Sequence, residues 1–388
     1  LGRRTGRITM VLLLLGVFWL TISGANVPSL WLERLFAWGG RWLRLGAEAM
    51  ALPPWLTGLL LDGAYDTAAR VVAVMLPPMA IFFPLFTLLE DFGYLPRAAF
   101  LLDHRFEACG GCGKQALTMA MGFGCNAAGV IGCRIITSPR ERLLAILTNA
   151  LVPCNGRFPA MIVLIALFFS ADSLAGAVIL TGFVVLSVGM TFLAAAVLSR
   201  SVLPGKPSPM VLEIPPFRRP RVGQILLRSL LDRTAAVTGR AVTVAAPAGM
   251  VLWLLGHGTL GGQSLLQHLA AVLDPLGLVL GMSGAILAAF LLSFPANELL
   301  LPLLATILSG SAVLTETEGA ALGTLLTAHG WTRQTALCTI LFLLFHWPCA
   351  TTCLTIRRET GSWRWTLLAM TVPTALGGIL CFAVGLLL

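Results

Sequence analysis

Long apolar runs recur along the whole chain and constrain its fold more than any other feature. A helix needs about 20 apolar residues to cross about 30 Å of hydrocarbon. Nine segments approach or exceed that length, near residues 8–25, 71–89, 116–136, 143–170, 173–199, 240–256, 277–309, 333–356 and 364–388. Only 11% of the residues are charged, against about 25% in soluble domains. Because no alternating strand pattern repeats, the chain is predicted to be an all-α polytopic membrane protein.

The charges and cysteines exclude two other classes of protein. The net charge is +9, but the Arg and Lys residues sit in connecting loops, as the positive-inside rule expects of a bacterial cytoplasmic membrane protein. No basic face interleaved with aromatic residues appears, so nucleic acid is not an expected partner. The nine cysteines fall partly inside apolar segments, which indicates reduced thiols or metal ligands rather than the disulfide framework of a secreted domain.

The pattern of Trp, Arg and Pro residues divides the chain into four parts. The predicted parts are a first transmembrane helix with an interfacial amphipathic segment (1–61), a first membrane half (62–200), a basic Pro-rich cytoplasmic linker (201–239) and a second membrane half (240–388). Basic residues place both the N-terminus and the linker in the cytoplasm. Five apolar segments lie between them, yet two ends on one side require an even number of crossings. One segment, interrupted near 122–132 or 153–159, is therefore expected not to cross.

The two membrane halves carry similar landmarks in the same order. Asn126 follows the sequence Phe-Gly-Cys, and Asn297 follows Phe-Pro-Ala. Further along each half comes a Pro-Cys pair, ending at Cys154 and at Cys349. The spacing to the second pair differs between the halves, so the predicted repeat is imperfect. Matched interruptions in two halves of a membrane protein point to a transporter's binding site near the midplane.

Two interrupted segments of the first half carry groups that bind cations. In Gly122-Phe-Gly-Cys-Asn126, the glycines loosen the helix and the last two residues offer a sulfur and an amide oxygen. In Pro153-Cys-Asn-Gly-Arg157, proline and glycine break the helix around Cys154 and Asn155. Simple helix packing is the alternative for the first segment. For the second segment, packing alone leaves Arg157 unexplained, and we expect that side chain to neutralise a carboxylate or a helix end.

The second half offers a carboxylate, an imidazole and further thiols. Glu298 follows Asn297 within a long apolar run, and an ionisable residue at membrane depth indicates function or an ion pair, here with Arg157. His346, Cys349 and Cys353 have i, i+3 and i, i+4 spacings. A continuous helix would place them on one face, with Pro348 disturbing its start. Imidazole and thiolate are ligands of first-row transition metals rather than of Mg²⁺ or Ca²⁺.

The pair Cys109-Gly-Gly-Cys112 has the spacing of half a zinc knuckle, but no second pair follows at the right distance. A structural or surface role is therefore favoured slightly over metal capture. The chain contains no Gly-x-x-x-x-Gly-Lys-Ser/Thr phosphate loop, and it offers no acid–base or nucleophile–base arrangement typical of an enzyme.

At these motifs the chain resembles the ferrous iron transport protein B (FeoB) family. The matching stretches begin at Cys112 (CGKQALTM), Gly122 (GFGCN), Ser138 (SPRERL), Pro153 (PCNGR), Pro295 (PANE), Gly330 (GWT), His346 (HWPC) and Thr355 (TIRRETGS). The resemblance implies a bacterial inner-membrane Fe²⁺ importer with two related gate regions, in which Cys125, Cys154 and Cys349 line the pathway. It also implies an N-terminal GTP-binding domain, which this sequence lacks, and small cytosolic accessory proteins.

The sequence thus predicts two pseudo-repeated halves with broken or re-entrant helices near the midplane. Fe²⁺ is the expected substrate and no tightly bound cofactor is expected; a homo-oligomer is compatible with the sequence. The predicted metal-contacting residues are Cys125, Asn126, Cys154, Asn155, Asn297, Glu298, His346 and Cys349. Two alternatives stay open, a transporter of nucleosides or other organic solutes and a membrane sensor subunit that binds metal without moving it.

Overall fold

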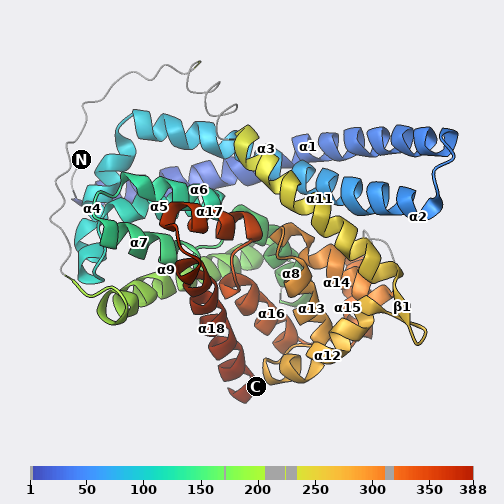
Figure 1. Ribbon diagram of the computed structural model, residues 1–388. Helices are drawn as coiled ribbons and strands as arrows, with labels where there is room; N and C mark the ends of the chain where they lie inside the picture. Colours follow the sequence, from blue (N-terminus) through green and yellow to red (C-terminus); the bar gives the residue numbers. More distant parts are fainter. Residues whose placement is uncertain (1–2, 170–171, 206–222, 224–233, 311–318, 388) are drawn as a thin grey trace.

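The computed structural model describes residues 3–169, 172–205, 223, 234–310 and 319–387, and most of them are helical (Figure 1). Within these residues the only strands are β1 (Thr259–Leu260) and β2 (Gln263–Ser264), which form a short antiparallel hairpin. The prediction of an all-α membrane protein is confirmed. Most of the predicted linker, residues 206–222 and 224–233, lies outside the described residues.

The first helix, α1 (Arg3–Ala49), is far longer than a membrane is thick. At about 1.5 Å per residue its 47 residues extend for about 70 Å, more than twice the thickness of the hydrocarbon core. The predicted spanning helix and most of the predicted interfacial segment both fall within α1, which continues through Pro28 although that residue lacks an amide donor. The chain then returns through α2 (Pro54–Thr57), η1 (Gly58–Tyr65) and α3 (Asp66–Asp91), which packs against α1.

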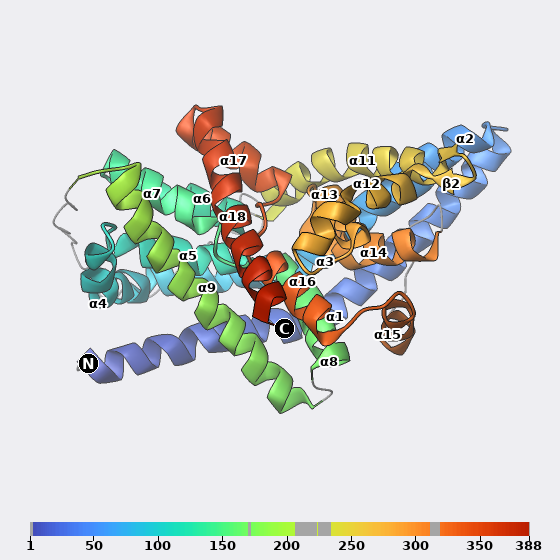
Figure 2. The ribbon, with the colours of Figure 1, turned by 90° about the horizontal axis from the view of Figure 1, so that it is seen from below.

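Four helical stretches in the described residues are long and apolar enough to cross a membrane. They are Pro54–Leu89, Leu174–Ser201 within α9 (Ser173–Ser201), Arg333–Thr360 and Trp363–Leu387, which is α18. A fifth exists if α12 (Leu265–Val279) and α13 (Gly284–Leu292), bent by 112° at their junction, form one span. In Figure 2, α9 and α18 lie in front of the other helices, and most of their apolar surface is uncovered, as a lipid-facing helix requires.

The remaining predicted segments are interrupted helices rather than straight spans. Both candidates for the one segment predicted not to cross are broken, at Cys125 and at 150–154. The shorter helices of the first half are α4 (Tyr94–Ala108), α5 (Lys114–Gly124), α6 (Asn126–Gly132), η2 (Cys133–Ile135), α7 (Pro139–Asn149), η3 (Asn155–Arg157) and α8 (Phe158–Phe168). Those of the second half are α11 (Ala235–His257), η5 (Asn297–Leu299), α14 (Leu300–Ser309), α15 (Gly319–Ala328), α16 (Arg333–Phe345) and α17 (Ala350–Thr360).

In each half, a turn that precedes the broken segment in the sequence is closed by a hydrogen bond from a glycine amide to an aspartate carboxylate. The Gly113 amide donates to Asp103 Oδ1 at 2.6 Å, and the Gly284 amide donates to Asp274 Oδ1 at 2.7 Å. In both pairs the carboxylate lies ten residues before the glycine. The backbone then extends at Cys125 and at Ala296, each with φ −154° and ψ 123°. The predicted Phe-x-x-Asn landmarks therefore share a local backbone geometry.

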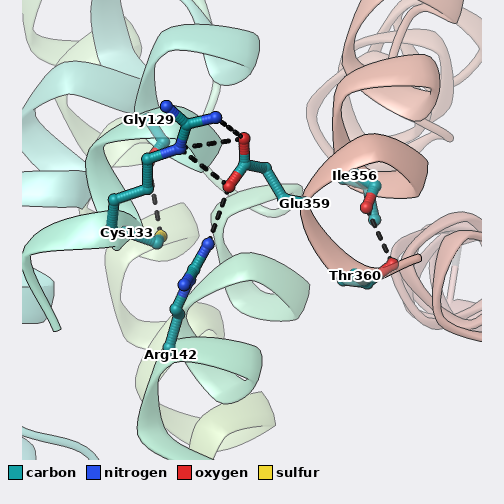
Figure 3. A network of polar contacts seen from close by, with 7 residues as sticks. Gly129, Cys133, Arg142, Ile356, Glu359 and Thr360 are labelled. Atoms are coloured by element: carbon teal, nitrogen blue, oxygen red, sulfur yellow. Dashed lines mark hydrogen bonds and ion pairs between the residues drawn. The ribbon is translucent and has the colours of Figure 1, made fainter. Parts of the chain in front are cut away.

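Helices from the two halves meet where α6 packs against α17. Beyond the end of α6, Arg134 of η2 reaches the carboxylate of Glu359 near the end of α17, with Nη2 at 2.5 Å from Oε1 (Figure 3). Arg142 of α7 binds the other oxygen, Oε2, at 2.7 Å. Glu359 is therefore held by two arginines of the first half.

Candidate functional site

A narrow cavity lies where the broken helices of the two halves meet. Its volume of about 30 Å³ leaves room for only one or two water-sized particles. Seven of the eight residues predicted to contact a metal line it: Cys125, Asn126, Cys154, Asn155, Asn297, Glu298 and Cys349. The rest of the lining comprises Met75, Met79, Gly124, Gly156, Ala241, Pro295, Ala296, Thr351 and Thr352. The cavity therefore unites polar groups that are far apart in the sequence.

The three cysteines of the cavity occupy equivalent places in their helices. Cys125 is the N-cap residue of α6, Cys154 that of η3 and Cys349 that of α17. The first amides of a helix have no partner within it, and they carry partial positive charge. None of the three side chains caps its own helix. Their sulfur atoms are therefore available to the cavity rather than bound to the first amides of their own helices.

Proline and glycine explain why the chain breaks at these places. Pro348 lacks an amide donor, and α16 ends at Phe345 before α17 begins at Ala350. The sequence predicted one helical face carrying His346, Cys349 and Cys353. That prediction is wrong, because the helix is interrupted between the first two of these residues. Cys353 lies inside α17, and its thiol donates to the Pro348 carbonyl oxygen at 3.4 Å.

His346 stands behind the cavity rather than in its wall. Its Nε2 lies 3.2 Å from Asn297 Oδ1, and its Nδ1 lies 2.9 Å from the Leu343 carbonyl oxygen. Asn297 Nδ2 in turn approaches Cys154 Sγ at 3.8 Å. The imidazole thus orients the Asn297 amide, which belongs to the second half, toward a thiol of the first half.

Arg157 ties the broken segment of the first half to the end of α16. Its Nη1 donates to the Leu344 carbonyl at 2.8 Å, and its Nη2 donates to the carbonyls of His346 at 3.1 Å and Trp347 at 3.3 Å. The side chain is fully buried. Carbonyls at a helix C-terminus carry partial negative charge that compensates the guanidinium. Arg157 therefore neutralises a helix end, one of its two predicted roles, and no ion pair with Glu298 is found among the described residues.

The Glu298 side chain, which belongs to the second half, lies against the backbone of Gly156 in the first half. A Cβ atom at Gly156 would collide with Glu298 Oε1 and lie 2.7 Å from its Cδ. Any side chain at this position of the Pro-Cys-Asn-Gly-Arg motif would therefore displace the Glu298 carboxylate. The carboxylate reaches the cavity because its neighbour in the other half is a glycine.

Sequence reasoning missed several residues that shape the cavity. Asn149, the last residue of α7, donates from Nδ2 to the Asn126 carbonyl oxygen at 2.9 Å and supports the start of α6. Met75 and Met79 of α3 line the wall, as do Thr351 and Thr352 of α17. The i, i+4 spacing of the two methionines was visible in the sequence, but an apolar helix offers many such pairs. Only the packing of α3 beside α5 and η5 distinguishes this one.

The cavity does not hold a preformed metal cage. Among the described residues, no group of three His, Cys, Asp or Glu side chains is arranged to bind a metal ion together. The thiols and carboxylate share one cavity but are not gathered around one point. The arrangement suits transient contact with an ion, whereas a structural metal site would hold closely spaced ligands.

The Cys109-Gly-Gly-Cys112 pair lies apart from the cavity. Burial and the neighbouring Glu141 carboxylate raise the pKa of the Cys112 thiol to about 12, and burial also raises the pKa of Cys109. Metals bind thiolates rather than thiols. Neither cysteine belongs to a metal-binding group among the described residues, and the structural or surface role favoured from the sequence stays a prediction.

Comparisons with known proteins match most of the chain. A family model described as "Gate: Nucleoside recognition" matches residues 72–168 and 238–363, more than half of the chain. A second model, described as "Ferrous iron transport protein B C terminus", matches residues 180–232. No solved structure gives a significant match.

Three curated relatives show the extent of the similarity. An Fe(2+) transporter FeoB of Staphylococcus aureus is 30% identical over 85% of this chain and 49% of its own length. One from Synechocystis is 29% identical over 85% of this chain and 53% of its own length. An Fe(2+) transport protein A/Fe(2+) transporter FeoB fusion protein of Porphyromonas gingivalis is 23% identical over 84% and 44%. The chain therefore spans about half the length of the curated relatives it matches.

Proposed function

The chain belongs to the Gate family and matches the membrane part of FeoB proteins, and on that premise we propose that it carries Fe²⁺ across the bacterial cytoplasmic membrane. One observation carries the proposal: thiol, amide and carboxylate groups from both halves line a single ion-sized cavity. The names of the relatives, Fe(2+) transporters, supply the identity of the ion. The donor set alone fits several first-row metals.

The mechanism follows from the composition of the cavity wall. Fe²⁺ sheds its water and contacts Cys125, Cys154 and Cys349 as thiolates, which release their protons when metal binds. The amides of Asn126, Asn155 and Asn297 and the carboxylate of Glu298 supply oxygen ligands. Mixed ligands that never close into a cage bind weakly enough to release the ion. His346 acts here through Asn297 rather than as a direct ligand.

Movement of one half against the other releases the ion in this mechanism. The thiols come from both halves, so a relative shift changes which ligands the ion can contact at once. The matched Asp–Gly hydrogen bonds and the matched backbone at Cys125 and Ala296 support two pseudo-repeated halves, within 62–200 and 240–388. Such repeats are the usual basis of alternating access around a central site.

Cavity size argues against the nucleoside alternative suggested by the description of the family model. Pockets for drug-sized organic ligands usually measure about 300–1,000 Å³, whereas this cavity measures about 30 Å³. The alternative of a metal sensor predicts that the protein binds Fe²⁺ without accumulating it in vesicles. The uptake experiment below distinguishes a sensor from a transporter. The proposed partners are a GTP-binding domain and a small accessory protein, the latter supported by the name of the fused relative from P. gingivalis.

Anaerobic proteoliposomes loaded with an Fe²⁺ chelator test the proposal. Wild type is compared with Cys154→Ser, His346→Ala and the control Cys133→Ser, whose buried thiol lies outside the cavity wall. We expect uptake to fall at least tenfold in the first two variants, a range typical of lost metal ligands and their supports, and to persist in the control. Unchanged uptake in Cys154→Ser would exclude the cavity as the pathway. Metal binding without wild-type accumulation would favour the sensor.

A further inference from the structure

Two thioether side chains share the cavity wall with the three thiols. Met75 and Met79 lie one helical turn apart on α3, so they face the same side of it. Both line the cavity that contains Cys125, Cys154 and Cys349. We propose that the Met75 and Met79 sulfur atoms are soft ligands that make this pathway reject Mg²⁺ and Ca²⁺. The inference rests on the proposed function and adds the basis of its ion selectivity.

The position of α3 supports this role. Met79 is only 6% exposed and packs in one apolar cluster with Cys125, while Met75 is half-buried at the edge of the same cluster. The helix between them holds Pro77 and Pro78, both buried, and two consecutive prolines restrict the backbone that carries the sulfur atoms. The backbone therefore holds both methionines beside a predicted ligand, Cys125.

The two sulfur atoms would make the cavity prefer Fe²⁺ over Mg²⁺ and Ca²⁺. The other donors include amide oxygens, the Glu298 carboxylate and the Thr351 and Thr352 hydroxyls, and oxygen ligands are what Mg²⁺ and Ca²⁺ prefer. A protonated cysteine loses its preference for softer metals because the thiolate is the ligand. A thioether carries no titratable proton, so it stays a soft donor at every pH. Two of them in a cavity this small penalise a hard ion that loses water without gaining oxygen ligands.

Packing is the competing explanation, since methionine commonly fills irregular gaps in apolar interiors. Replacement by leucine separates the two roles. Leucine nearly conserves the volume of methionine, and such exchanges usually cost little stability, but it removes the sulfur atom. A packing role predicts little change in the Met75→Leu/Met79→Leu double variant, whereas a ligand role predicts altered metal preference in a folded protein.

The experiment compares wild type, the double variant and the control Met121→Leu. Met121 packs against the same apolar cluster but does not line the cavity. In proteoliposomes, we expect the double variant to need roughly tenfold more Fe²⁺ for half-maximal uptake and to become sensitive to millimolar Mg²⁺, while the control behaves as wild type. Wild-type Fe²⁺ affinity and Mg²⁺ resistance in the double variant would overturn the inference.

A second measurement keeps the inference separate from the transport proposal. Binding of Cd²⁺, a soft probe, is measured by calorimetry on the detergent-solubilised full chain. We expect roughly tenfold weaker Cd²⁺ binding in the double variant and unchanged binding in Met121→Leu. This result would support thioether ligands even if wild-type vesicles accumulated no Fe²⁺, an outcome that would count against transport alone. Equal Cd²⁺ affinities in all three proteins would exclude Met75 and Met79 as ligands.

Discussion

Arg134 binds the carboxylate of Glu359 through both Nε and Nη2, although 225 residues separate them in the chain (Figure 3). The pair joins the far ends of two packed segments whose near ends carry Cys125 and Cys349. A helix is stiff over this length, so the spacing of the two far ends constrains the spacing of the two cysteines. The ion pair is therefore a structural tie between the cavity walls contributed by the two halves.

Loss of that tie is expected to loosen the cavity without unfolding the protein. Glu359→Gln removes the charge that two arginines share, but the Arg134 side chain is 65% exposed, so the pair is screened and contributes only about 1 kcal/mol. We expect a fall of a few degrees in the midpoint of thermal unfolding in detergent, smaller in high salt than in low salt. An unchanged midpoint at low salt would show that Glu359 does not hold the halves together.

Arg157→Met is expected to destabilise the protein far more. The change leaves two buried carbonyls and one half-buried carbonyl near the end of α16 without their donor, and breaking a buried charged network usually costs about 3–5 kcal/mol. The measurements are thermal unfolding in detergent and the yield of monodisperse protein. The exposed Arg358 of α17 offers a matched control, since Arg358→Met should leave both unchanged. Equal stabilities of the two variants would contradict the role assigned to Arg157.

Gly156→Ala tests whether Glu298 must lie directly on the backbone of the first half. The added methyl group would occupy the place of the Glu298 carboxylate, so we expect Fe²⁺ uptake to fall at least tenfold if the carboxylate contacts the ion. Gly182→Ala in α9 is the control, because nothing lies within 4 Å of a Cβ atom there. Normal uptake by Gly156→Ala would remove Glu298 from the proposed pathway.

Cys112 is expected to resist alkylation at neutral and mildly alkaline pH. Its pKa of about 12, raised by burial and by Glu141, keeps the thiol protonated at pH 8, and only the thiolate reacts. Removing the carboxylate charge in Glu141→Gln should lower this pKa and speed the reaction. Iodoacetamide labelling followed by peptide mass spectrometry, with the more exposed Cys109 as internal reference, gives the rates. Faster labelling of Cys112 than of Cys109 in the wild type would contradict the expectation.

The sequence by itself determined that this protein lies in a lipid membrane, and it determined where its helices break. Apolar runs with few charges require helices in lipid, because backbone groups must be paired within the segment. Prolines and glycines at Pro153, Gly156 and Pro348 interrupt helices locally, and those interruptions are in the structure. Such signals are readable because they act within one or two turns. The metal contacts of the polar residues beside them stay a prediction.

Only the tertiary structure decided which of those residues meet. It placed His346 behind Asn297 instead of on one face with Cys349 and Cys353, because α16 stops one residue before the imidazole. It gave Arg157 the carbonyls of α16 rather than Glu298 as partners. These contacts join groups 49 to 189 residues apart. Their formation depends on how whole helices pack, and no local pattern in the chain encodes that arrangement.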